Sequence, residues 1–241
     1  MMEAFKISFN LKTTYRTNSI IYSLKSIPII KKALPESLYA NHKLKTLATV
    51  LSILHEIGTF FIGKLLYILL MVFLVSGKMK SSQSESFIHI FFFLTLIGAL
   101  LNTQMFSPTK DKFYAMFLMR MDAKAYTLSN YFYFLFKTVV GFLPIIILFG
   151  LLSKVPLLIC LLMPLLAVSV KTMIAAYTLY DSVKEDKADK ESLHSKIAIA
   201  VVIILLACAY VLPYFGYTIN EPAFLILSAI SFIGSASAFR Y

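Results

Sequence analysis

Charged side chains are scarce in this sequence. Asp, Glu, Lys and Arg make up 15% of the 241 residues, whereas hydrophobic residues make up 59%. Soluble domains contain about 25% charged and about 45–50% apolar residues. A chain with so few charges does not have enough polar surface for a water-soluble domain of this size, so we expect an integral membrane protein.

Cysteine is nearly absent, and metal-binding patterns are missing. The two cysteines, Cys160 and Cys208, each lie inside an apolar run. This argues against a disulfide scaffold and predicts buried, inert thiols. His55 and Glu56 are adjacent and could form a catalytic pair, but Thr59 stands where a zinc-binding HExxH helix needs its second histidine. We therefore expect an interfacial role for this pair and no metal site.

Acidic residues are outnumbered by basic ones, which gives a net charge of +11. Nucleic-acid binding would require a basic stripe interleaved with exposed aromatic residues. Here the basic residues flank apolar runs, as membrane orientation requires. We expect a lipid bilayer and no nucleic acid among the partners.

Long apolar runs predict the fold class. A helix needs roughly 20 apolar residues to cross about 30 Å of hydrocarbon, and only helices or closed barrels satisfy their backbone groups in lipid. The sequence predicts an all-α, polytopic membrane protein with a 1–56 cytosolic and interfacial amphipathic region and a 57–241 six-span transmembrane domain. The predicted spans are about 57–76, 87–106, 131–152, 156–180, 197–217 and 223–239.

The distribution of basic residues predicts the orientation. Seventeen of the 23 Lys and Arg residues fall before the first span, in the loops after spans two and four, or after span six; three fall in the opposite loops. The positive-inside rule then places both termini in the cytosol of a multi-pass cell-membrane protein. In the N-terminal region, an apolar stripe among lysines predicts an amphipathic helix in the headgroup plane, formed by Leu44, Leu47, Val50, Leu51 and Leu54.

Three lysines lie within predicted spans: Lys64, Lys137 and Lys171. Each falls in the cytosolic half of its helix, so its long side chain can reach the headgroups by snorkelling. Charged groups inside a membrane are also costly and often functional, so these residues are candidate pathway residues as well. No Asp or Glu lies deep in any span, which weakens an ion-relay function.

The stretch from Lys110 to Tyr126, between spans two and three, is half apolar and half charged. Its length predicts a helix of about three turns lying flat beneath the membrane on the cytosolic side. A helix held at both ends by spans moves those spans when it is displaced. This property suits the coupling of a cytosolic motor to a membrane pathway.

The chain carries one false nucleotide motif. Residues 58–64 match GxxxxGK, but Leu65 replaces the Ser or Thr that binds magnesium, and the match lies inside a span. No cofactor is expected in this chain; energy from ATP and Mg would have to come through another polypeptide.

This topology resembles the permease subunit of the ABC-2 type exporter family. The run from Arg120 to Ser129, followed by the apolar YFYFLFKTVVGFLP, is similar to the family's segment that enters span three. The resemblance implies an ABC transporter in which a dimer of permeases, or of permease halves, binds a cytosolic ABC ATPase. Many family members place short re-entrant helices between spans five and six, whereas only Thr218–Pro222 separates those spans here.

The resemblance also implies functional residues. The ATPase contact would be formed by the coupling-helix residues Arg120, Met121, Asp122, Ala123 and Lys124. Asn102 and Gln104 would face the pathway or hydrogen-bond a neighbouring helix. The chain would have no catalytic residues and would export an amphipathic substrate such as a peptide, lipid or drug.

Two other classes remain open. An ATP-independent membrane assembly or immunity factor would share this topology and act by interaction alone. A membrane-embedded enzyme would need converging acids, histidines or a nucleophile with its base, and the spans offer almost none.

Overall fold

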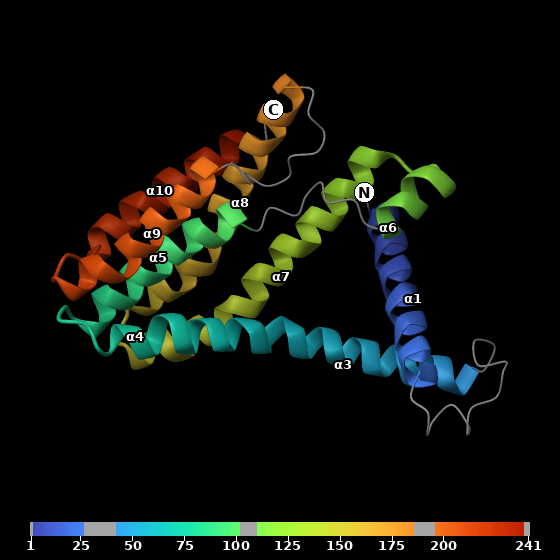
Figure 1. Cartoon of the computed structure of the whole chain (residues 1–241), viewed down its shortest axis with the longest axis horizontal. Helices are drawn as coiled ribbons and strands as arrows, with labels where there is room; N and C mark the ends of the chain where they lie inside the picture. The colour runs from blue at the N-terminus through green and yellow to red at the C-terminus, as the bar shows by residue number, and fades with distance from the viewer. Residues whose placement is uncertain (1, 27–41, 102–109, 186–195, 239–241) are drawn as a thin grey trace. The chain divides into compact units, whose positions relative to one another are not determined.

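The computed structural model describes residues 2–26, 42–101, 110–185 and 196–238, and every regular element in them is helical (Figure 1). The predicted all-α class is therefore confirmed for these residues. The α-helices are α1 (Met2–Ser26), α3 (His42–Leu66), α4 (Leu74–Ser76), α5 (Gln83–Leu101), α6 (Lys110–Phe113), α7 (Ala123–Leu152), α8 (Leu157–Glu185), α9 (Lys196–Tyr214) and α10 (Glu221–Ala238). Two π-helices, η2 (Tyr67–Phe73) and η3 (Tyr114–Leu118), interrupt them.

Within the described ranges, five helical stretches are long and apolar enough to cross a membrane, which supports a membrane protein. They are Ala48–Ser76, Gln83–Leu101, Ala123–Leu152, Leu157–Tyr180 and Glu221–Ala238. The fifth predicted span, 197–217, falls on α9, whose apolar part, Ile199–Tyr214, is shorter. The count of six spans therefore stays a prediction.

Two helices, α3 and α7, begin at least eight residues before their predicted spans. The first helical stretch starts at His42 instead of residue 57, because the apolar stripe before Ile57 continues into the span without a Gly or Pro to stop it. Helix α7 starts at Ala123 instead of residue 131. There the Asp122 Oδ2 atom accepts a hydrogen bond of 2.7 Å from the Ala125 N–H, which caps the helix before its apolar part begins.

The chain divides into two compact units. The N-terminal unit comprises Met1–Ile62 and Pro108–Tyr133, and the bundle unit comprises Gly63–Ser107 and Phe134–Tyr241. The predicted division at residue 56 left residues 108–133 with the transmembrane domain, whereas the structure groups them with the N-terminal helices.

The bundle unit is built around α5, which packs against α8 and α9, while α10 packs against α8 (Figure 1). Its core contains fully buried large side chains, among them Phe87, Phe91, Ile146 and Met163. The small residues of the last span permit close packing, since a Cβ on Gly234 would lie 2.7 Å from the Met173 Cε atom. Of the two cysteines predicted to be buried, Cys160 is buried, whereas Cys208 is half-buried.

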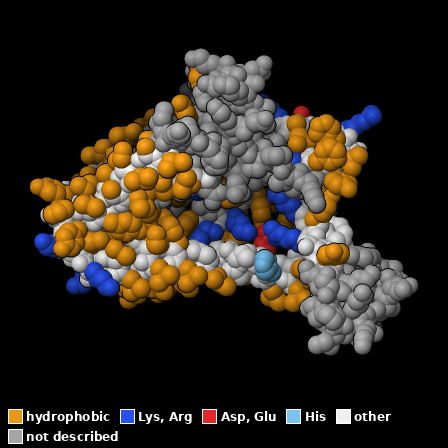
Figure 2. Space-filling view, in the orientation of Figure 1, with side chains coloured by type: hydrophobic (Ala, Val, Ile, Leu, Met, Phe, Trp, Pro, Cys, Tyr) orange, Lys and Arg blue, Asp and Glu red, His pale blue; other side chains and the backbone are white. Residues whose placement is uncertain are grey.

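The surface of the bundle helices is hydrophobic (Figure 2). Large apolar side chains are well exposed on separate helices, including Leu158 at 62%, Ile203 at 61% and Ile233 at 72%. In a soluble protein, apolar patches of this extent mark a binding surface or cause aggregation. Hydrocarbon is the environment that such a surface requires.

Candidate functional site

The three lysines predicted inside spans all belong to the bundle unit. Lys64 from α3, Lys137 from α7 and Lys171 from α8 are all half-buried.

Lys64 packs directly onto the backbone of α7. Its Nζ atom lies 5.6 Å from the ring centroid of Phe142, a cation–π distance. A Cβ added to Gly141 would lie 2.7 Å from the same Nζ atom. The absence of a side chain at Gly141 therefore makes room for the ammonium group.

Lys171 points at two neighbouring helices. Its Nζ atom donates a hydrogen bond of 3.3 Å to the Gly98 carbonyl of α5 and lies 5.3 Å from the ring centroid of Phe134 in α7. Snorkelling would carry the ammonium group along its own helix towards the cytosolic surface. These contacts instead direct it towards the interior of the bundle unit.

Two acidic residues of the bundle unit, Asp181 and Glu185, lie in the last turns of α8. Glu85 is in the first turn of α5 and Glu221 in the first turn of α10. Gly98, which Lys171 contacts, follows Glu85 by about 20 Å of helix at 1.5 Å per residue. Gly234, which contacts α8 at Met173, follows Glu221 by about the same length. Acidic residues therefore occur at both ends of the bundle unit.

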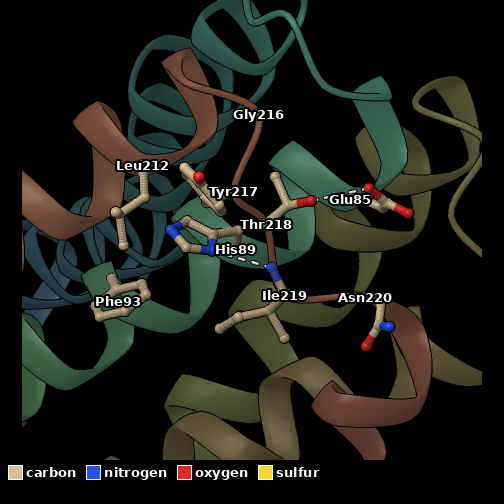
Figure 3. Close-up of a pocket in the computed structure, with 9 residues that line it drawn as sticks. All are labelled: Glu85, His89, Phe93, Leu212, Gly216, Tyr217, Thr218, Ile219 and Asn220. Atoms are coloured by element: carbon tan, nitrogen blue, oxygen red, sulfur yellow. Dashed lines mark hydrogen bonds between the residues drawn. The ribbon is translucent and has the colours of Figure 1, made fainter.

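A second feature is an open pocket of about 500 Å³ beside Glu85, at the N-terminal end of α5 (Figure 3). Helix α5 contributes Glu85, His89 and Phe93, and the remaining lining comes from the end of α9 and the loop that follows it: Leu212, Gly216, Tyr217, Thr218, Ile219 and Asn220.

His89 fastens this loop to α5. Its Nδ1 atom accepts a hydrogen bond of 3.1 Å from the Ile219 N–H (Figure 3), and its Nε2 atom lies 3.0 Å from the Cys208 carbonyl oxygen. A carbonyl only accepts, so Nε2 carries the proton and both ring nitrogens are occupied. The Thr218 hydroxyl donates to Glu85 Oε2 at 2.8 Å. We call this arrangement the loop latch; with His89 only 2% exposed, it suits structure better than acid–base chemistry.

The N-terminal unit contains a polar network. Arg16 of α1 forms a 2.5 Å ion pair with Glu56 Oε2 of α3, and the Tyr133 hydroxyl of α7 donates to Glu56 Oε1 at 3.0 Å. Glu56 thus joins three helices and is occupied by structural contacts. This supports the interfacial interpretation of the His55–Glu56 pair over the catalytic one.

Helix α1 makes further contacts with the start of α7. Asn130 Oδ1 accepts hydrogen bonds from Ser8 Oγ at 2.5 Å and from Lys12 Nζ at 2.6 Å. The rings of Phe5 and Phe9 lie with their centroids 5.8 and 6.3 Å from that of Tyr133. We call these contacts, together with the Glu56 ion pair, the α1 clamp.

The predicted coupling helix is divided in the structure, so the expectation of one helix from Lys110 to Tyr126 is wrong. Helical structure over α6 and η3 ends at Leu118, Arg120 adopts a left-handed conformation with φ 50°, and α7 begins at Ala123. Arg120, Asp122, Ala123 and Lys124 are exposed, while Met121 is half-buried. Four of the five predicted contact residues therefore face outward around a helix break.

The remaining predicted pathway residues, Asn102 and Gln104, lie outside the described residues. Across the described ranges, no group of three or more His, Cys, Asp or Glu side chains is placed to hold a metal ion. His89 and Asn130 were not among the residues predicted from the sequence. A lone histidine in the apolar run IHIFFF was the available signal for the first; nothing local singled out the second.

Comparison with protein-family models, with curated proteins and with solved structures found no match. The resemblance to ABC-2 type permeases therefore depends on the residues and the helix pattern of this chain alone.

Proposed function

We propose that this chain is the membrane-embedded permease subunit of an ATP-driven exporter of the ABC-2 type. In this proposal it has six spans with both termini in the cytosol, pairs with a second permease subunit or half, and moves an amphipathic substrate. ATP and Mg bind to a separate cytosolic ATPase. The chain itself catalyses no reaction.

The α1 clamp is the observation that carries the proposal. It links helix α1 to the middle of α3 through Glu56, and to the N-terminal part of α7 through Asn130 and Tyr133. These contacts lie within two helical stretches that are long and apolar enough to cross a membrane, Ala48–Ser76 and Ala123–Leu152. A displacement of the cytosolic helices is therefore passed to two spans at once.

The surface available to a partner supports the same interpretation. Phe113 and Phe117 stack at 5.0 Å between ring centroids and are 52% and 70% exposed, so they offer an apolar face to lipid or protein. The exposed Arg120 and Lys124 follow on the same segment. Asp122 caps α7, so its carboxylate has a structural role that a test must leave intact.

The test is co-purification of an ATPase with the full-length chain from its native membrane. We expect the captured protein to hydrolyse MgATP, and we expect the combined change Arg120→Glu and Lys124→Glu to abolish capture while the chain stays folded. The matched control is Lys154→Glu, because Lys154 is also basic, exposed and left-handed at φ 61° but belongs to the loop between α7 and α8. Capture should survive the control change.

Three outcomes would contradict the proposal. One is the absence of any ATPase in the purified complex. Another is full function in cells whose partner ATPase cannot hydrolyse ATP, which would favour an assembly or immunity factor. The third is transport or chemistry by the purified chain without a partner.

A further inference from the structure

The pocket beside Glu85 has walls that hydrogen bonds hold in place (Figure 3). The Ile219 N–H donates to His89 Nδ1 at 3.1 Å, which fastens the loop after α9 to α5. The Thr218 hydroxyl donates to Glu85 Oε2 at 2.8 Å and adds a second link between them. At the other end of the loop, Asn220 Oδ1 accepts a hydrogen bond of 3.1 Å from the first turn of α10. A ligand that enters a cavity with fixed walls does not have to order them, which lowers the free-energy cost of binding.

Glu85 gives this cavity a negative charge. Of the nine described lining residues, it carries the formal charge, since His89 accepts at one ring nitrogen and donates from the other as a neutral imidazole. Thr218 occupies Oε2, and in the part of the chain that the structure describes Oε1 makes no hydrogen bond. Lys80, the basic residue that most closely precedes Glu85, holds its Nζ atom 5.2 Å from the ring centroid of Tyr214, which does not line the cavity. The cavity therefore suits a cation that can donate a hydrogen bond.

The remaining walls are mostly apolar or aromatic. Figure 3 shows Phe93 and Leu212 to one side of His89 and Glu85 to the other. Tyr217, which is 71% exposed, adds a ring whose face attracts cations. The volume of about 500 Å³ falls within the range of about 300–1,000 Å³ that small-molecule sites occupy. These walls fit the hydrocarbon part of a small ligand.

We propose that this pocket binds a primary ammonium group carried on a short apolar stem. The ammonium group donates a charge-assisted hydrogen bond to Glu85 Oε1, and the stem lies against Phe93 and Leu212. Phe93 follows Glu85 by about 12 Å of helix at 1.5 Å per residue, so a stem of several carbon atoms is needed to reach it. The inference goes beyond the proposed function, because it requires neither an ATPase nor a second subunit.

The test titrates n-hexylammonium chloride against the full chain in dodecyl maltoside micelles at neutral pH. Amide hydrogen exchange of peptides covering residues 215–222 is the readout, because a ligand in the pocket should hold this loop closed and slow its exchange. Hexanol and hexanoate carry the same stem without a positive charge. Hexyltrimethylammonium keeps the charge but has no N–H donor. We expect saturable slowing with hexylammonium, and much weaker or no slowing with the other three at the same concentration.

Glu85→Gln removes the charge and retains an amide oxygen that can accept from Thr218. It should raise the half-saturating hexylammonium concentration about tenfold or more, as expected for the loss of a charge-assisted hydrogen bond. Glu221→Gln is the matched control, because Glu221 also lies in the first turn of its helix, α10, but does not line the cavity. The half-saturating concentration should change little in this control.

A second variant blocks the cavity and leaves Glu85 in place, in case Glu85→Gln does not fold. Leu212→Trp puts a larger side chain into the lining and should abolish the saturable slowing. Leu206→Trp is its control, because Leu206 lies on the same helix, is 43% exposed and does not line the cavity. Binding should survive that change.

A free amine and the ethanolamine head group of a phospholipid share this ammonium chemistry. Displacement of hexylammonium by lysophosphatidylethanolamine, but not by lysophosphatidylcholine, would assign the pocket to a lipid head group. Displacement by neither would assign it to a free amine.

Binding equal to that of the unmodified chain in either folded variant, Glu85→Gln or Leu212→Trp, would overturn the proposal. So would equal slowing by hexanoate or hexanol, or equal weakening by Glu85→Gln and Glu221→Gln. Because the assay contains no ATPase, failure of the partner proposal would not alter these results.

Discussion

Replacing His89 by Ala should release the loop that follows α9. The change removes two hydrogen bonds, from the Ile219 N–H at 3.1 Å and to the Cys208 carbonyl at 3.0 Å, and the contact of the imidazole with the Phe93 ring at 4.7 Å between centroids. Each hydrogen bond contributes about 1 kcal/mol. Local opening of the loop should therefore become easier by about 2 kcal/mol, or about 30-fold in its equilibrium constant.

Amide hydrogen exchange, followed by mass spectrometry on peptides covering residues 215–222, reads this opening directly. His89→Asn provides a graded comparison, because its amide oxygen occupies the place of Nδ1 and keeps the Ile219 bond while losing the Cys208 bond. Exchange should then accelerate only about fivefold, as expected for about 1 kcal/mol. His55→Ala, at an exposed histidine of α3, should leave this loop unchanged. Exchange in His89→Ala at the rate of the unmodified chain would refute the latch.

Three further changes test the helix ends and the α1 clamp. Gly216→Ala should destabilise the protein by about 1–3 kcal/mol, because φ is 92° there, and a lower unfolding temperature in detergent would show it. Lys154→Gly should stabilise the protein by about 1 kcal/mol, because Lys154 adopts a left-handed conformation with φ 61°, which costs a non-glycine residue free energy. An unchanged or lower unfolding temperature would contradict this prediction. A double-mutant cycle of Arg16→Ala and Glu56→Ala should give a coupling free energy of at most about 1 kcal/mol, because the Arg16 side chain is 41% exposed. A coupling free energy of several kcal/mol would contradict this exposure of the ion pair to solvent.

The ends of the helices show which parts of the fold the sequence can predict. The end of α7 at Leu152 and the position of α10 agree with the apolar runs, because hydropathy marks where a chain can lie in lipid. The starts of α3 and α7 were missed, because a helix continues into polar sequence until a cap or a breaker ends it. Asp122 is such a cap, but it was interpreted as part of a contact surface.

Helix α9 ends through a mechanism that hydropathy does not reveal. The Tyr217 N–H donates to the Leu212 carbonyl at 2.9 Å and the Gly216 N–H to the Pro213 carbonyl at 3.1 Å, around a left-handed Gly216. This is the Schellman arrangement, for which a glycine is the usual sequence signal. Lys154 and Arg120 adopt left-handed conformations although neither is a glycine, so their residue types did not predict that the helices are interrupted there.

The candidate sites were predicted only in part. Lysines inside apolar runs stand out by themselves, but the contacts of Lys64 and Lys171 with neighbouring helices depend on helix packing, and spacing along the chain says nothing about them. His89 and its partner Ile219 are 130 positions apart, as are many contacts that specify a fold. Such pairs follow from tertiary structure, and a single sequence provides no signal for them.

Helix α5 contributes His89 to the loop latch at one end of the bundle unit, and the Gly98 carbonyl to the hydrogen bond of Lys171 at the other. His89 and Gly98 are separated by about 14 Å of helix at 1.5 Å per residue, and they share none of the contacts described above. Changes more than about 7–10 Å apart without shared partners are usually additive. The decreases in unfolding temperature caused by His89→Ala and by Lys171→Met should therefore add in the double variant. A decrease that differs from this sum would show that the two ends of α5 are coupled.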